Sequence, residues 1–162
     1  MSALPLPGPR GFSRRTLLAV SAAGLGLLAT GCTSAPPADR REQVTGEQVD
    51  LLQDQVGVQE ALVAAYAAAG AADPALAAEV APLTAQAGEQ LARLRAAAPG
   101  ATPPAAPPGT PPSPAEARSW LRAQVAAAAD SHARACVRQA GARAALLGSV
   151  AAGLRGQEGR LA

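Results

Sequence analysis

Residues 51–76 read LLQDQVGVQEALVAAYAAAGAADPAL, and their pattern predicts the first helical hairpin of the chain. Its core-facing positions recur at spacings of three and four, which is the period of one face of an α-helix. The resulting stripe consists of Leu51, Gln55, Val58, Leu62 and Tyr66, widened by Leu52, Gln59 and Val63. We predict an amphipathic helix that begins near Val44 and ends near Gly70. Asp73 and Pro74 then supply the N-cap and the first position of a second helix.

A second helical stripe follows directly. Its seam consists of Leu76, Val80, Leu83, Ala87, Gln90 or Leu91, and Leu94. Pro82 lies inside this segment, where proline removes a backbone hydrogen bond, so we expect a kink there or a later start of the helix. Only about four residues, 70–73, connect the two helices, which makes them antiparallel neighbours.

A proline-rich segment separates this hairpin from the rest of the chain. Eight of the sixteen residues 99–114 are proline, so neither a helix nor a central strand is expected there. The segment is either a flexible insertion or a crossover, that is, an extended connection that returns along the bundle. In polyproline geometry, at about 3.1 Å per residue, it would span roughly 50 Å, against about 37 Å for the second helix. The crossover alternative starts the third helix parallel to the second, as in four-helix bundles with one long connection.

Two further helices are expected after this segment. Ser113, Pro114 and Glu116 are typical of a helix start, with serine as the cap and glutamate in the capping-box position. One face of the third helix carries Leu121, Val125, Ala128, His132 and Ala135 or Cys136. Gly141 is expected to end it. The apolar side of the fourth helix consists of Leu146, Leu147, Val150, Leu154 and Leu161. We therefore predict an all-α fold, a four-helix bundle over residues 44–162.

The N-terminal segment is typical of an export signal. Three arginines precede an uncharged run over residues 16–30. This run is shorter than the roughly 20 residues that cross a bilayer, and it matches the apolar region of a signal peptide. A buried core helix is the alternative. Residues 13–18, SRRTLL, resemble a twin-arginine signal, with Arg14 and Arg15 as the export residues, although Leu17 stands where an aromatic residue is often found.

Residues 28–32, LATGC, resemble a bacterial lipobox, in which the cysteine is lipidated and becomes the first residue of the mature chain. Ala29 stands where leucine is usual. We predict that Cys32 is lipidated, that residues 1–31 are the signal peptide and that residues 32–43 are a flexible tether. Two acyl chains, such as palmitate, meet the requirement for stable anchoring. The predicted location is the extracytoplasmic face of the cell membrane, reached through the twin-arginine or the general export machinery.

The composition excludes several classes of protein. Of 162 residues, 44 are alanine, and Phe12, Tyr66 and Trp120 are the only aromatic residues. A fold with a large aromatic core is therefore not expected. All 14 basic residues are arginine, and loss of residues 1–31 would leave 11 of them against 12 acids. A nearly neutral mature chain without a basic stripe argues against a nucleic-acid partner.

The sequence contains no clear catalytic or metal-binding pattern. Ferritin-like bundles that bind two metals use Glu-x-x-His pairs, which the chain lacks, so we predict no metal, no cofactor and no catalysis. His132 and Cys136 share a helical face, but a buried histidine and an inert cysteine are commoner than a nucleophile with its base. The alternative is a degenerate metal or redox protein that uses Glu60, Asp130, His132 and Cys136.

Three stretches carry a family resemblance: residues 59–66 (QEALVAAY), 73–77 (DPALA) and 83–86 (LTAQ). They resemble the ferritin-like domain of exported, often twin-arginine-signalled lipoproteins of actinobacteria, over about residues 44–157. The resemblance implies a ferritin-like bundle with a long proline-rich crossover between the second and third helices, without metal ligands or an established activity. The resulting hypothesis is an envelope lipoprotein whose bundle is a binding or structural module. Its partner would be an envelope protein or a second copy of the chain.

Overall fold

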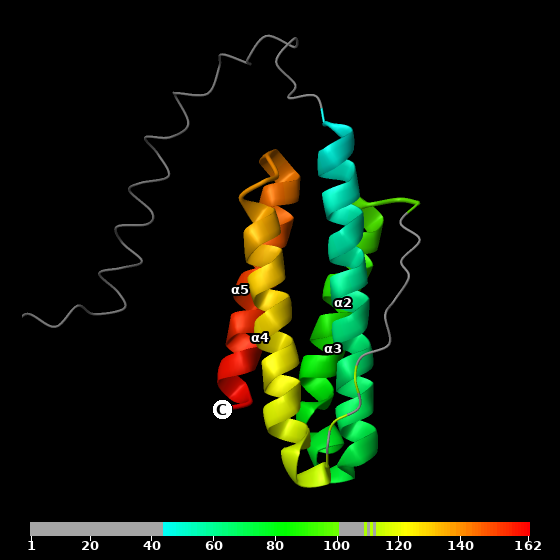
Figure 1. The fold of residues 1–162 in the computed structure, drawn as a ribbon, viewed down its shortest axis with the longest axis vertical. Helices are drawn as coiled ribbons and strands as arrows, with labels where there is room; N and C mark the ends of the chain where they lie inside the picture. Colours follow the sequence, from blue (N-terminus) through cyan, green and yellow to red (C-terminus); the bar gives the residue numbers. More distant parts are fainter. Residues whose placement is uncertain (1–43, 101–108, 110, 112) are drawn as a thin grey trace, which may run out of the picture. The chain divides into compact units, whose positions relative to one another are not determined.

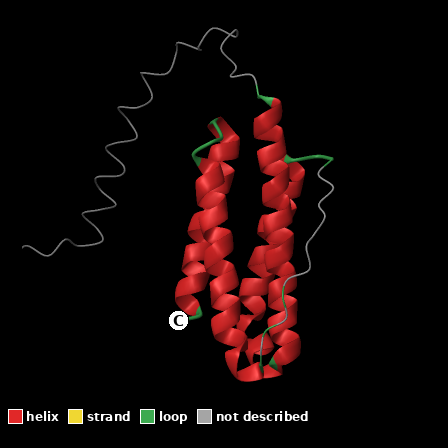
Figure 2. Cartoon of the chain, viewed as in Figure 1, coloured by secondary structure: helices red, strands yellow, loops and turns green. Residues whose placement is uncertain are grey.

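The computed structural model describes residues 44–100, 109, 111 and 113–162 of the chain. Every regular element in these ranges is helical (Figure 2). The elements are α2 (Gly46–Ala72), α3 (Pro74–Ala97), the 3₁₀ turn η2 (Pro114–Glu116), α4 (Ala117–Cys136) and α5 (Gly141–Arg160). The predicted all-α bundle of four helices is thus confirmed for this part of the chain. No helix there combines the length and the apolar character that a bilayer crossing requires.

The four helices form two hairpins, α2 with α3 and α4 with α5, which pack on each other mainly through α2 and α4 (Figure 1). α3 and α5 approach each other at fewer places. α3 and α4 run in the same direction (Figure 1), and Glu79 near the start of α3 pairs with Arg118 near the start of α4. That direction agrees with the crossover alternative. Residues 101–108, 110 and 112 of the proline-rich segment lie outside the described residues.

One residue, Asp73, connects α2 to α3. Its backbone N–H donates to Ala69 O of α2 at 2.9 Å, which satisfies the end of that helix. Its carboxylate accepts from the backbone N–H groups of Ala75 and Leu76 at 3.0 and 3.2 Å, which caps the start of α3. The predicted cap is confirmed. The predicted four-residue connection is wrong, because a single residue serves both helix ends.

α3 runs through Pro82 without a break. The expected later start is therefore wrong, since Asp73 and Pro74 begin the helix as a capped N-terminus. Pro82 and Ala78, whose carbonyl loses its helical partner, are both exposed. Water can satisfy that carbonyl, so the missing hydrogen bond is tolerated on this side of the helix.

The second hairpin begins and turns differently from the prediction. Ser113 does not cap the helix; its hydroxyl donates to Glu116 Oε2 at 2.6 Å, and the 3₁₀ turn η2 precedes α4. Gly141 does not end the third helix, because α4 already ends at Cys136. Gly141 is instead the first residue of α5, with a φ of 54°. This left-handed backbone, which glycine adopts without strain, turns the chain into the last helix.

The core extends along the bundle and consists mainly of leucine, valine and alanine. Its fully buried large side chains include Leu52, Val56, Leu76, Val80, Leu94, Leu121, Leu147 and Leu154. Burial of each such side chain stabilises the fold by about 1.5–3 kcal/mol. Alanine at the remaining seam positions lets the helices come close together. At the α2–α3 hairpin, a Cβ on Gly70 would lie only 3.0 Å from Ala77 Cβ.

Candidate functional site

The bundle interior contains a buried polar group, here called the central polar cluster, formed by Gln59 of α2, Gln90 of α3 and His132 of α4. Gln59 and His132 are fully buried, and Gln90 is 6% exposed. The Gln59 side-chain N–H groups donate to Ala87 O at 3.0 Å and to Gln90 Oε1 at 3.2 Å. Gln59 Oε1 lies 3.0 Å from His132 Nε2. A single amide therefore joins three of the four helices.

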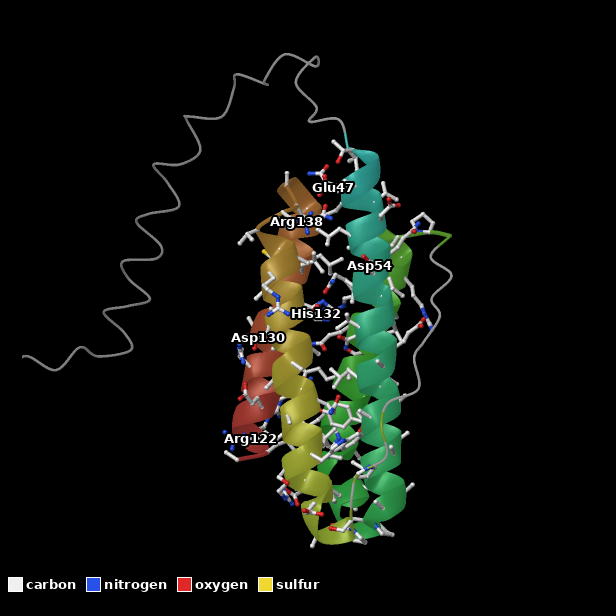
Figure 3. All side chains as sticks on the ribbon, viewed as in Figure 1. Glu47, Asp54, Arg122, Asp130, His132 and Arg138 are labelled. Atoms are coloured by element: carbon white, nitrogen blue, oxygen red, sulfur yellow. The ribbon has the colours of Figure 1, made fainter. Side chains whose placement is uncertain are left out.

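His132 is neutral in this arrangement. Gln59 Oε1 can only accept a hydrogen bond, so the proton lies on Nε2 of the imidazole. Burial lowers the pKa of His132 to about 4, because the charged form loses its hydration. Figure 3 shows the ring between α4 and α2. Its Nδ1 is left as a buried acceptor without a hydrogen-bond partner in the described part of the chain.

Two further polar contacts join the hairpins. The Tyr66 hydroxyl of α2 donates to Gln157 Oε1 of α5 at 2.8 Å, and both residues are buried. Desolvation raises the pKa of Tyr66 to about 12, although the positive charge of Arg160 acts in the opposite direction. The Ser131 hydroxyl of α4 donates to Gln55 Oε1 of α2 at 3.2 Å. Buried polar groups in this bundle thus bond mainly to one another across helices.

A groove of about 170 Å³ between α3 and α5 reaches the central polar cluster from the surface. It is lined by Gln86, Glu89, Gln90, Arg93, Ser149, Val150 and Gly153. Gly153 leaves the space that Gln90 occupies, since a Cβ there would lie 2.7 Å from Gln90 Nε2. The groove is smaller than the roughly 300–1,000 Å³ of typical ligand pockets. It is therefore small for an organic ligand.

A second pocket, about 270 Å³, lies where α2 begins and α4 meets α5. It is lined by Val44, Gln48, Gln139, Ala140, Gly141, Ala142 and Arg143. The Gln139 side-chain N–H donates to Gln48 O at 2.7 Å. Gln139 Oε1 and Arg143 Nη1 are both buried without a hydrogen-bond partner in the described residues. α5 starts beside them without a side-chain cap from the described residues, so its first backbone N–H groups lack a capping side chain there.

The structure does not bring together the residues of the metal or redox alternative. Glu60 accepts from an arginine of α3 at 2.7 Å, and Asp130 pairs with an arginine of α5. The Cys136 thiol donates to a backbone carbonyl of the α5 helix at 3.2 Å, whereas His132 faces α2. Across the described ranges, no group of three or more His, Cys, Asp and Glu side chains is placed to hold a metal ion.

The predicted export and lipidation residues lie outside the described residues. Arg14, Arg15 and Cys32 all fall within residues 1–43, for which the structure gives no placement. The boundaries at 1–31 and 32–43 fall there as well. These assignments stay predictions.

The partners of the polar side chains inside the bundle were not predicted. The helical period puts Gln55, Gln59 and Gln90 on the core-facing stripes, but it does not indicate their partners and gives no sign of Gln157. A glutamine at a seam position is the signal that could have found them, because buried polar groups in folded proteins almost always have partners. Such a position therefore points to a polar contact with another helix.

Comparison of the chain with models of known families, with curated proteins and with solved structures gives no match.

Proposed function

We propose that the chain is an exported cell-envelope lipoprotein whose helical bundle is a non-catalytic binding or structural module. Acylated Cys32 would hold it on the extracytoplasmic face of the membrane. The observation that carries this proposal is the order of features in residues 10–32: an arginine pair, an uncharged run and a cysteine at its end. That order is typical of a signal peptide that ends at a lipidation site.

The contacts inside the bundle support a structural role for its polar side chains. The central polar cluster and the Tyr66–Gln157 pair join helices to one another. A general acid or base must reach a proton of its substrate, whereas these groups are buried and bonded to each other. Binding is therefore expected on the surface of the bundle. A ferritin-like arrangement with a proline-rich crossover over residues 99–114 belongs to this proposal, and the shared direction of α3 and α4 supports it.

The metal or redox alternative has less support, because Glu60, Asp130 and Cys136 are bonded to partners that lie away from His132. Metal analysis of the purified protein separates the two functions. Iron, manganese or zinc bound in stoichiometric amount would favour the alternative. Only traces of these metals are expected for a non-catalytic module.

The test of the lipoprotein is intact mass spectrometry of protein extracted from the membrane of a bacterial host that acylates lipoproteins. We expect a mass that corresponds to loss of residues 1–31 and addition of acyl chains. The Cys32→Ala variant should lack both changes. The matched variant Cys136→Ala removes the other cysteine of the chain and should keep both. An uncleaved, unmodified chain in the wild type would contradict the proposal.

A further inference from the structure

Two large apolar side chains stay exposed among the described residues, and both lie at the same end of the bundle. Val137 directly follows α4 and is 84% exposed, and Val44 precedes α2 and is 51% exposed. The start of α2 lies beside the turn between α4 and α5 (Figure 1), where Arg138 pairs with Glu47 (Figure 3). We call this the proximal end. Exposed apolar side chains that gather in one place indicate a contact surface.

The proximal end also carries two arginines that form no ion pair with the described residues, and Asp50 near the start of α2 is unpaired there as well. Arg143 lines the 270 Å³ pocket with its Nη1 buried and unpaired. Arg134 lies in the last turn of α4 and makes no ion pair within the described ranges. The uncapped N–H groups at the start of α5 add a partial positive charge. The Arg143 guanidinium, beside the uncapped backbone N–H groups of α5, favours an anion with several oxygens, such as a phosphate.

The predicted tether joins the bundle at this end. The twelve residues 32–43 begin with Cys32 and end directly before Val44, and they span at most about 40 Å when fully extended. α2, with 27 residues, has about the same length, since an α-helix rises 1.5 Å per residue. An anchored Cys32 therefore keeps the proximal end within about 40 Å of the membrane, whereas the opposite end can lie up to a bundle length beyond that distance.

We propose that the proximal end docks on the membrane surface that holds Cys32. Val44 and Val137 lie at the level of the lipid headgroups, and Arg134 and Arg143 bind the phosphates of anionic lipids. This proposal rests on the lipid anchor of the proposed function. It leaves the opposite end, where η2 lies, directed away from the membrane and accessible to an envelope partner.

The test uses the mature lipoprotein in vesicles of brominated phosphatidylcholine, with or without phosphatidylglycerol. Bromine quenches a tryptophan that touches the lipid. Trp120, the single tryptophan, is replaced by phenylalanine, and a reporter is placed at the proximal end by Val137→Trp. The matched control is Ala115→Trp, an exposed position of η2 at the opposite end. We expect quenching at position 137, stronger with phosphatidylglycerol, and none at position 115.

Removal of one arginine charge tests the size of the electrostatic contribution. Adding Arg143→Gln to the Val137→Trp protein should lower the ratio of membrane-contacting to free orientations about fivefold in anionic vesicles, as expected for one basic residue near such a surface. Equal quenching in neutral and anionic vesicles would overturn the role of the arginines. A reporter at position 137 that is unquenched, or quenched no more than that at position 115, would overturn the docking and leave the proximal end to a protein partner.

Flotation of the same vesicles separates this inference from the proposed function. Protein that floats with the vesicles but shows no quenching at position 137 is anchored and does not dock, so only the inference fails. Protein that does not float lacks the lipid anchor, and both fail together.

Discussion

Lowering the pH from 7 to 5 is expected to destabilise the bundle through His132. The unfolded chain binds the imidazole proton with an ordinary pKa of 6.5, whereas burial in the folded protein lowers this pKa to about 4. Between these values the unfolded state binds more protons than the folded state, so stability increases with pH. The stabilisation is fully present above about pH 6.5 and is lost as the pH falls toward 4.

The size of the effect follows from these two pKa values. One pKa unit is worth about 1.4 kcal/mol, so the full difference is worth about 3 kcal/mol, of which about 2 kcal/mol is lost between pH 7 and pH 5. Carboxylates contribute little in this interval, because their ordinary pKa values lie near 4. The bond from Arg118 lowers the pKa of Glu79 still further. His132 is the only histidine of the chain, so the loss is assigned to one side chain.

Urea unfolding followed by far-UV circular dichroism measures this loss. With a slope of about 1–3 kcal/mol per molar urea, the midpoint should fall by about 1 M between pH 7 and pH 5. The control is His132→Gln, which keeps an N–H donor for Gln59 but does not titrate. It is expected to be less stable at both pH values and to show no fall between them. A wild type without the fall, or a control with the same fall, would refute the buried neutral imidazole.

Three further predictions concern the packing around Gly153, the cap formed by Asp73 and the Tyr66–Gln157 hydrogen bond. Thermal unfolding measures each of them. Gly156→Ala, which enters open space, should stabilise the protein by about 1 kcal/mol. The free energy of unfolding of Gly153→Ala should be about 1 kcal/mol lower than that of Gly156→Ala, because the new Cβ would force Gln90 out of its hydrogen bond with Gln59. Equal thermal midpoints for the two variants would contradict this packing. Asp73→Ala should lower the free energy of unfolding by about 1–2 kcal/mol, whereas Asp73→Asn should lower it much less, because asparagine can also cap a helix. Equal losses of stability in the two variants would exclude the cap. Tyr66→Phe should cost about 1–2 kcal/mol by leaving its glutamine acceptor unpaired, and an unchanged midpoint would show that water replaces the hydroxyl.

The helices were predictable because their signals are local. Spacings of three and four placed Leu76, Val80 and Leu94 in the core, and all three are buried. Asp73 was predictable as a cap because an aspartate before a proline and an apolar run is a start signal. Helix ends were less predictable. Whether Gly141 ends one helix or begins the next depends on the backbone conformation that the turn adopts, which spacing does not contain.

The central polar cluster was not predictable from spacing. A helical period shows which residues face inward, but it does not show which residue of another helix each one meets. Gln59 is hydrogen-bonded to Gln90, which lies 31 residues away in the sequence, and to His132, which lies 73 residues away. Those contacts depend on how the hairpins are aligned. For the same reason the sequence suggested that His132 and Cys136 share a face, whereas their bonds are made to α2 and to α5.

Alanine-rich seams have a consequence for the alignment of the two hairpins. Where the seam holds alanine, a slide of one helical turn, about 5.4 Å, would exchange one apolar side chain for another, and cores tolerate volume-conserving apolar exchanges at low cost. The same slide would separate Gln59 from His132 and Tyr66 from Gln157, at about 1–3 kcal/mol for each buried group left unpaired. The buried amides therefore select one axial register among several of similar shape, a role that a single buried asparagine has in coiled coils.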